Sequence, residues 1–106
     1  MDRYKLSDCG ARGWFVGDFD GAVYRTKGFE VCYQLNSRGH TLSHIHKEIT
    51  EITLVISGKL LLNGEIFEAG EIHVLYPGEV SQLEYLEETS VVTIKTPSIP
   101  SDKFML

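Results

Sequence analysis

Two histidines and a carboxylate near the middle of the chain have the spacing of a metal site. His44 and His46 are two residues apart, and in an extended strand such side chains point to the same face. Glu51 follows the mostly polar link of residues 47–50, which is short enough for a hairpin-like return. Two histidines and one carboxylate are the ligands of catalytic zinc sites and of non-haem iron centres, which keep open positions. The spacing therefore predicts a site for a divalent Fe, Mn, Ni or Zn ion.

A second carboxylate, Glu48, is closer to His46 in sequence but falls in the expected turn, where a solvated side chain is the default. Glu51 begins an apolar segment, and an unpaired carboxylate buried there would be costly unless a cation neutralised it. Glu51 is therefore the preferred ligand. His40, which follows a glycine, is expected to lie in a loop that could border a pocket.

The elements that must hold these side chains are short strands. Glycines recur at short intervals, and no segment between them has a long 3.6-residue apolar period. The segments are rich in Val, Ile, Thr, Tyr and Phe, which is typical of strands joined by tight turns. The pattern predicts an all-β sandwich or barrel. The expected strands span residues 14–16, 22–26, 29–35, 41–46, 51–57, 59–62, 65–68, 71–76, 82–86 and 90–96.

Turn residues predict one hairpin and one tail. Asn63 and Gly64 lie between two apolar segments, and both tolerate the positive φ that a type I′ turn requires. This pair predicts a tight hairpin. Pro97 and Pro100 cannot donate to a strand ladder, so residues 97–106 are expected to form a tail that leaves the sheet.

The segment of residues 51–57 is unusual because both of its alternating faces are largely apolar. One of these faces carries Ile52, Leu54 and Ile56. An antiparallel sheet usually leaves one face in water. We therefore expect this face to be covered by the N-terminal segment or by a second copy of the chain, and the second case would make the protein a homodimer.

Composition limits the size of the protein and its partners. The chain has 106 residues, of which 42% are hydrophobic and 24% charged, as expected for one globular domain over residues 1–106. The net charge is −5, and residues 54–106 hold eight acidic but only three basic residues. That half would repel a polyphosphate backbone, and no cluster of Lys and Arg appears, so nucleic acid is not expected as a partner.

Several familiar signatures are missing from the sequence. No apolar segment approaches the roughly 18 residues of a membrane span, and the first residues lack the apolar core of a signal peptide. A cytoplasmic protein with no membrane partner is expected. Cys9 and Cys32 lack the spacing of a zinc or disulfide framework and are expected to be buried thiols. Nucleotide-binding glycine loops, the nucleophile elbow of hydrolases and the HExxH motif were not found.

The order of these residues resembles the two sequence motifs of the cupin superfamily. The resemblance spans residues 39–81. It implies a jelly-roll, or double-stranded β-helix, barrel in which the two histidines and the glutamate hold a metal ion. The residues that carry it are Gly39, His44, His46, Glu51 and Gly58 for the first motif, and Gly70, Pro77 and Gly78 for the second. Gly39 is one residue closer to His44 than in the family pattern, and Pro77 is one residue later, with Tyr76 at the usual place of the proline.

One departure from the cupin pattern concerns the metal. Many cupins supply a fourth ligand, a histidine three residues after the last glycine of the second motif, and that position is Ser81 here. His73 and Gln82 are the candidates to replace it. However, His73 precedes the turn, and Gln82 would face away from Ser81 in a regular strand. We expect three protein ligands completed by water, or a degenerate site, and we expect His73 to be a half-buried or satisfied strand histidine.

The resemblance implies a metal-dependent enzyme acting on a small molecule, with an isomerase, epimerase or dioxygenase reaction. The alternatives are a non-catalytic module that binds a small ligand or a metal, and a purely structural dimer. A sugar nucleotide would need cations near the pocket, and Arg25, Lys27 and Arg38 are available. Only one of the neighbours Tyr33 and Gln34 can point inward. The possible pocket residues are Tyr33 or Gln34, Thr53, Ser81, Gln82 and Tyr85.

Overall fold

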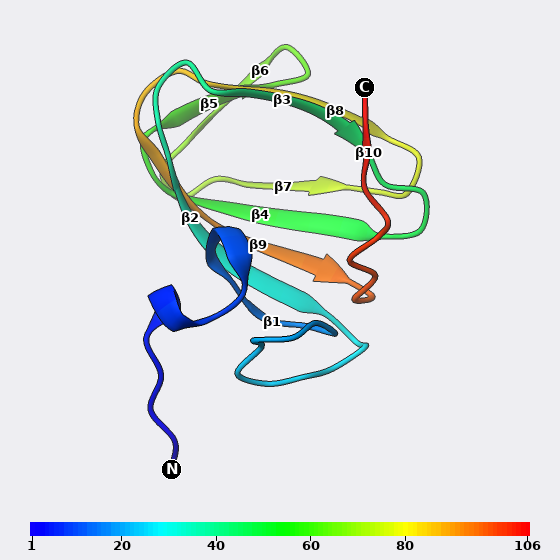
Figure 1. Cartoon of the computed structure of the whole chain (residues 1–106). Helices are drawn as coiled ribbons and strands as arrows, with labels where there is room; N and C mark the ends of the chain where they lie inside the picture. The colour runs from blue at the N-terminus through cyan, green and yellow to red at the C-terminus, as the bar shows by residue number, and fades with distance from the viewer.

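Two antiparallel sheets of five strands lie face to face (Figure 1). The computed structural model describes residues 1–106. The strand order is β1-β2-β9-β4-β7 in the first sheet and β10-β3-β8-β5-β6 in the second. No helix is long and apolar enough to span a membrane. The elements are η1 Leu6–Asp8, η2 Ala11–Gly13, β1 Trp14–Val16, β2 Glu30–Asn36, β3 Thr41–Ile45, β4 Thr50–Ser57, β5 Lys59–Leu62, β6 Glu65–Glu68, β7 Ile72–Leu75, β8 Val80–Tyr85, β9 Thr89–Thr96 and β10 Phe104–Met105.

The space between the sheets is polar at one end of β4 and apolar at the other. Side chains alternate along a strand, so Glu51, Thr53 and Val55 share the inner face of β4. The polar side chains of this face come first along the strand, and Val55 is fully buried in the core. The core cluster consists of Val55, Leu60, Leu62, Leu75, Tyr85 and Val91, with Phe67 and Leu83 packed against it.

The structure confirms the all-β, jelly-roll expectation and the predicted hairpin. Strands β5 and β6 pair with Leu62 opposite Glu65. The two residues of the turn, Asn63 and Gly64, have φ values of 50° and 84°. These are the left-handed conformations that a type I′ turn needs and that Asn and Gly tolerate.

The expected strand over residues 22–26 is wrong. Only Tyr24 makes a bridge, to Val16, and the rest of the segment is a loop. Arg25 forms ion pairs of 3.2 and 2.9 Å with two aspartates of the preceding turn. The segment folds back on that turn, so its Val and Tyr residues do not form a strand with a neighbour.

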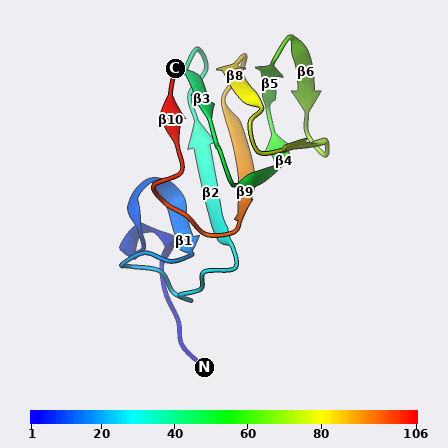
Figure 2. The same cartoon turned by 90° about the vertical axis from the view of Figure 1, so that its right-hand side faces the viewer.

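The C-terminal tail also differs from expectation. Residues 97–103 leave the first sheet, but Phe104–Met105 then form β10, which pairs with β3 opposite Ile45 and His44 (Figure 2). The expectation that the whole tail stays outside the sheets is therefore wrong. Its return brings the end of the tail beside the strand that carries His44.

The N-terminal segment does not cover the outer face of β4. Leu54 is 37% exposed and Ile56 is 46% exposed. The expectation that the N-terminal segment packs on this face is wrong, because that segment lies near β1 and β2 at the other edge of the sheet (Figure 1). The outer face of β4 is therefore exposed in the single chain.

Candidate metal centre

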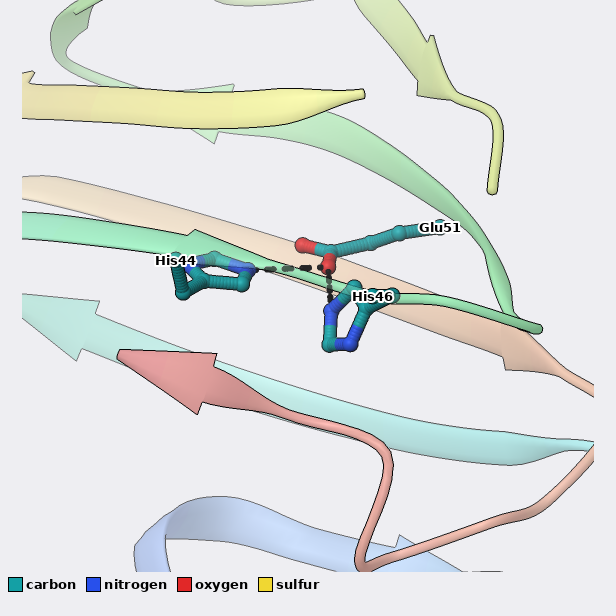
Figure 3. Close-up of side chains that lie close together, drawn as sticks. All are labelled: His44, His46 and Glu51. Atoms are coloured by element: carbon teal, nitrogen blue, oxygen red, sulfur yellow. Dashed lines mark hydrogen bonds and ion pairs between the residues drawn. The ribbon is translucent and has the colours of Figure 1, made fainter. Parts of the chain in front are cut away.

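Three donor atoms meet where β3 and β4 are joined. His44 belongs to β3, His46 directly follows that strand, and Glu51 lies near the start of β4 (Figure 3). Oε2 of Glu51 lies 2.7 Å from Nε2 of His46 and 3.5 Å from Nε2 of His44. The ligand atoms of the three side chains all lie within 4.8 Å of one another. The structure therefore brings together the three residues that the spacing singled out.

A hydrogen bond on the far side of the ring orients His46. Its Nδ1 donates to the backbone carbonyl of Asp102, in the C-terminal tail. In a neutral ring, a donating Nδ1 leaves a lone pair on Nε2, the nitrogen that is directed at the carboxylate of Glu51. Metal-binding histidines are commonly fixed in this way, by an acceptor for the second ring nitrogen.

The donor set fits a divalent metal ion. A lone pair on Nε2 of His46 and an oxygen of Glu51 at 2.7 Å repel each other unless a proton or a metal ion lies between them. Separations of 2.7 and 3.5 Å between donor atoms suit ligands that lie about 2.0–2.2 Å from one ion. Two imidazoles and one carboxylate suit Fe, Mn, Ni or Zn.

Glu51 is ionised in this setting. Burial raises its pKa, but the two histidines and the charge of Lys95 together hold the pKa of Glu51 well below its usual range. The carboxylate is therefore ready to bind a cation near neutral pH. The other candidate, Glu48, is exposed in the turn and is not part of the cluster.

Asp102 holds the turn between the ligands. Its carboxylate accepts hydrogen bonds from the backbone N–H groups of Lys47, Glu48 and Ile49, at 2.9, 2.8 and 3.0 Å. Burial raises the pKa of Asp102, but these three donors hold it below its usual range. No local pattern predicts this role, because Asp102 is more than 50 residues away from the turn that it binds.

A cavity of about 60 Å³ adjoins the metal centre between the sheets. Tyr33 and Gln82 lie outside this cavity, and both are exposed. Strand alternation turns these two possible pocket residues to the outer faces of β2 and β8. Gln34, the neighbour of Tyr33, lines the cavity instead. The expected pocket residues that do line it are Thr53, Ser81 and Tyr85.

His73 also lines the cavity. It lies opposite Thr53, which is two residues further along β4 than Glu51. It is half-buried, as expected, but its Nδ1 has no hydrogen-bond partner. Burial lowers the pKa of His73, so its imidazole is neutral at neutral pH. His73 is not part of the three-residue cluster, and it faces the space beside the centre.

Ser81 occupies the place of the fourth cupin ligand. It lies directly opposite His44 on the neighbouring strand β8, and it is buried on the inner face. A histidine at this position would stand beside the ring of His44, whereas the short hydroxyl is not part of the cluster. His40 is exposed, and its ring stacks on that of Tyr85 at 6.1 Å, outside the cluster.

Three cations that the sequence did not indicate line the cavity, namely Arg12, Lys95 and Lys103. They come from the N-terminal turn, β9 and the tail, so no local motif contains them. The cations considered from the sequence, Arg25, Lys27 and Arg38, are not among the lining residues. The one available signal was strand phase, since Lys95 shares the inner face of β9 and lies directly opposite Glu51.

Comparison with solved structures finds the same architecture. A conserved protein with a double-stranded β-helix domain from Klebsiella pneumoniae is 26% identical, with a TM-score of 0.66 over 74% of this chain and 70% of that chain. A cupin protein from Bacteroides fragilis is 24% identical, with a TM-score of 0.57 over 68% of each chain. Pac13, a nucleoside dehydratase, is 14% identical, with a TM-score of 0.72 over 100% of this chain and 91% of its own. No protein-family model and no curated protein sequence matches the chain.

The likenesses agree with the two motifs and with the observed sheets. The matches to the Klebsiella and Bacteroides structures each cover more than two thirds of this chain. The first structure is described as having a double-stranded β-helix domain and the second as a cupin protein. The two five-stranded antiparallel sheets have the layered arrangement of that fold. The chain is therefore a small protein of the cupin fold.

Proposed function

We propose that the chain is a metal-dependent cupin enzyme that acts on a small molecule. The observation that carries this proposal is the convergence of His44, His46 and Glu51 beside an internal cavity, which His44 and Glu51 line. A divalent ion bound there supplies a Lewis acid that polarises a carbonyl or hydroxyl oxygen. Three protein ligands leave coordination positions free for that oxygen.

Two further groups on the cavity wall support proton transfer. His73 is neutral, and its buried Nδ1 has no partner, so it is suited to accept a proton. Burial, and next the charge of Glu51, raises the pKa of Tyr85 to about 12, so its phenol stays protonated and can donate. An isomerase or epimerase needs a base and an acid beside a polarised carbonyl, and this favours those reactions over a dioxygenase reaction.

One observation favours the competing function, a non-catalytic module that binds a ligand or a metal. Ser81 replaces the fourth histidine, and three protein ligands hold a metal less tightly than four. A module would use the same cavity without turnover. Both functions use the same cavity and can use the same metal, but only the enzyme converts a substrate.

Metal binding is tested by calorimetric titration of the metal-stripped chain with Fe(II), Mn(II), Ni(II) and Zn(II) in the absence of oxygen. We expect one ion per chain, and an affinity more than about 100-fold lower in His44→Ala/His46→Ala. His40→Ala removes a histidine outside the cluster and should bind like the wild type. A wild-type chain that takes up no ion after reconstitution would remove the metal centre.

Turnover is tested with a panel of aldoses and 2-hydroxy ketones in D₂O, by NMR detection of hydrogen exchange at carbon, with an oxygen electrode in parallel. We expect exchange in the metal-loaded chain and its loss in His73→Gln and Tyr85→Phe, with metal binding unchanged. Oxygen uptake would instead support the dioxygenase reaction. Ligand binding with neither signal would support the module.

We also propose a homodimer formed through the outer face of the first sheet. No residue of its two central rows is charged, and five of the eight are 36–58% exposed. The exposed patch is on the order of 500 Å², so two copies would bury about 1,000 Å², the lower bound of a specific interface. Across β2, β9, β4 and β7 the two rows are Tyr33, Val92, Leu54 and Ile72, and Val31, Ile94, Ile52 and Val74.

A further inference from the structure

Four residues border both the internal cavity and a groove outside it. The groove measures about 320 Å³ and lies between the N-terminal turn and the C-terminal tail. The shared residues are Arg12, Trp14, Lys95 and Lys103. We refer to Arg12, Lys95 and Lys103 as the cationic rim. A small molecule that passes from the groove toward the metal centre passes this rim.

The backbone holds Arg12 in an uncommon conformation. Its φ and ψ are 60° and 31°, in the left-handed region that residues other than glycine seldom adopt. Nε2 of Gln34 donates to its carbonyl at 2.9 Å. The next residue, Gly13, packs so closely on β2 that an added Cβ would lie 1.9 Å from the carbonyl oxygen of Tyr33. Non-glycine residues held in such conformations cluster at functional sites.

The two lysines of the cationic rim form no ion pair with an acidic side chain. Lys95 lies directly opposite Glu51 in the sheet, but its Nζ lies over the ring of Trp14, 4.6 Å from the centroid. Lys103 is half-buried in the tail. Neither lysine, nor Arg12, takes part in any of the five ion pairs of the structure. The rim therefore presents three positive charges without a bound counter-charge.

The three charges of the rim act on one another. Burial, and next the charges of Arg12 and Lys95, lower the pKa of Lys103. Such a shift shows that the ammonium group of Lys103 lies in an environment that disfavours its charge. An anion placed among the three groups would reverse that effect.

The acidic groups near the rim are already engaged. Glu51 faces the two histidines of the metal centre. In the groove, Asp20 pairs with Arg25 at 2.9 Å, and the buried Glu30 accepts a hydrogen bond from Ser98 at 2.9 Å. The neighbouring carboxylates thus leave the rim free for an anion from solution.

We propose that the cationic rim binds the oxyanion group, a carboxylate or a phosphate, of a small anionic substrate. Arg12 offers a planar set of N–H donors that matches an oxyanion, and the lysines add two point charges. The cavity of about 60 Å³ is far smaller than a typical ligand pocket of roughly 300–1,000 Å³. The reacting end of the molecule would therefore enter the cavity while its charged group stays at the rim. The entry of the reacting end into the cavity rests on the proposed function, whereas the binding of an anion at the rim does not.

The test is a titration with inorganic phosphate and with malonate at low ionic strength, in which the NMR signals of the backbone amides detect binding. We expect saturable shifts at residues 12, 95 and 103. Arg12→Gln/Lys95→Gln/Lys103→Gln should weaken binding by more than about 100-fold, and each single change by about tenfold. The single variants decide the outcome if the triple variant does not fold. Lys5→Gln/Lys27→Gln/Arg38→Gln makes the same change in net charge and should bind like the wild type.

A second arm separates this inference from the metal centre. In His44→Ala/His46→Ala the probes should bind as in the wild type, because the rim does not need the metal. Anion binding without metal uptake by the wild type would thus overturn the proposed function and support the rim. Binding of only one probe would identify the oxyanion as phosphate or carboxylate. No binding, or equal loss in both triple variants, would overturn the rim.

Discussion

The two faces of β4 invert the usual distribution of polarity. The inner face carries Glu51 and Thr53 before it reaches the core at Val55, whereas the outer face carries Leu54 and Ile56 in exposed positions. A polar group is normally buried only when it has a partner or a task, and a large apolar patch is normally exposed only where something covers it. The inner face therefore suits the proposed ligand site, and the outer face suits the proposed contact with a second copy of the chain.

The rest of the molecule follows the same contrast. Ten buried residues are polar or charged and only eight are hydrophobic, so the interior serves a site as well as a core. His44, Ser81 and Thr93 are among the buried polar residues. On the outer face of the first sheet, Leu54, Ile56 and Ile72 are meanwhile exposed. Substitutions on the outer face and on the inner face test this contrast separately.

The largest effect is expected on the outer face. Leu54→Glu/Ile94→Glu would place four carboxylates in the interface of a dimer, where like charges and their desolvation oppose contact. We expect light scattering after gel filtration to show a dimer for the wild type at micromolar concentration and a monomer for the variant. The dissociation constant should rise by more than about 100-fold, with about 1.4 kcal/mol for each factor of ten.

Ile66→Glu is the matched control for this experiment. Ile66 is 56% exposed, but it lies on β6 in the second sheet. It should leave the dimer unchanged. A wild-type chain of monomer mass at micromolar concentration would contradict the dimer and leave the apolar face without a cover.

The next effect concerns the support of the inner face. Asp102→Ala would leave three backbone N–H groups of the β3–β4 turn without their acceptor. We expect the free energy of unfolding in urea to fall by about 1–2 kcal/mol. Metal affinity should fall by about tenfold, since the orientation of His46 depends on the same loop. Asp8→Ala, at an exposed aspartate, should change neither quantity.

The same carboxylate predicts a dependence on pH. The pKa of Asp102 is lower in the folded chain than its usual value of about 3.9 in an unfolded chain. Its contribution to stability is therefore complete above that value and is lost as the pH falls through the lower, folded pKa. Urea unfolding of the metal-free chain between pH 6 and 3 should show a steeper loss for the wild type than for Asp102→Asn. Parallel curves would contradict the role of Asp102.

The smallest effect is a gain on the inner face. Ser81→His would place a third imidazole opposite His44, at the position where many cupins have their fourth ligand. We expect metal affinity to rise by about tenfold in calorimetry. Gln82→His adds a histidine to the outer face of the same strand and should leave affinity unchanged. An affinity unaltered by Ser81→His would show that this position does not reach the ion.

The metal cluster could be predicted from the sequence because its three residues all lie within residues 44–51, on two strands joined by a short turn. Strand alternation brings His44 and His46 to one face, and a short hairpin returns Glu51 to them. The hairpin at Asn63 was predictable for the same reason, since its backbone requirement is local. Local rules were thus enough for the centre and for most strands.

The residues around the cluster could not be predicted, because tertiary contacts place them. Asp102 reaches the β3–β4 turn only after the tail has returned as β10, and Arg12 reaches the cavity through a turn on β2. The choice between Tyr33 and Gln34 required the register of β2 against β9. Register and tail docking are long-range properties that a single sequence does not contain in any local pattern.

The hydrogen bond from His46 to Asp102 joins two residues that are 56 positions apart. Bringing such distant residues together means closing a long loop, and that entropy must be offset by the contacts that the docked tail makes. The ring of His46 is therefore held in this orientation only in chains whose tail has docked. An ion bound to His44, His46 and Glu51 would favour chains with a docked tail and would oppose local unfolding of the tail. The resistance of the tail to proteolysis would therefore report the fraction of the protein that carries metal.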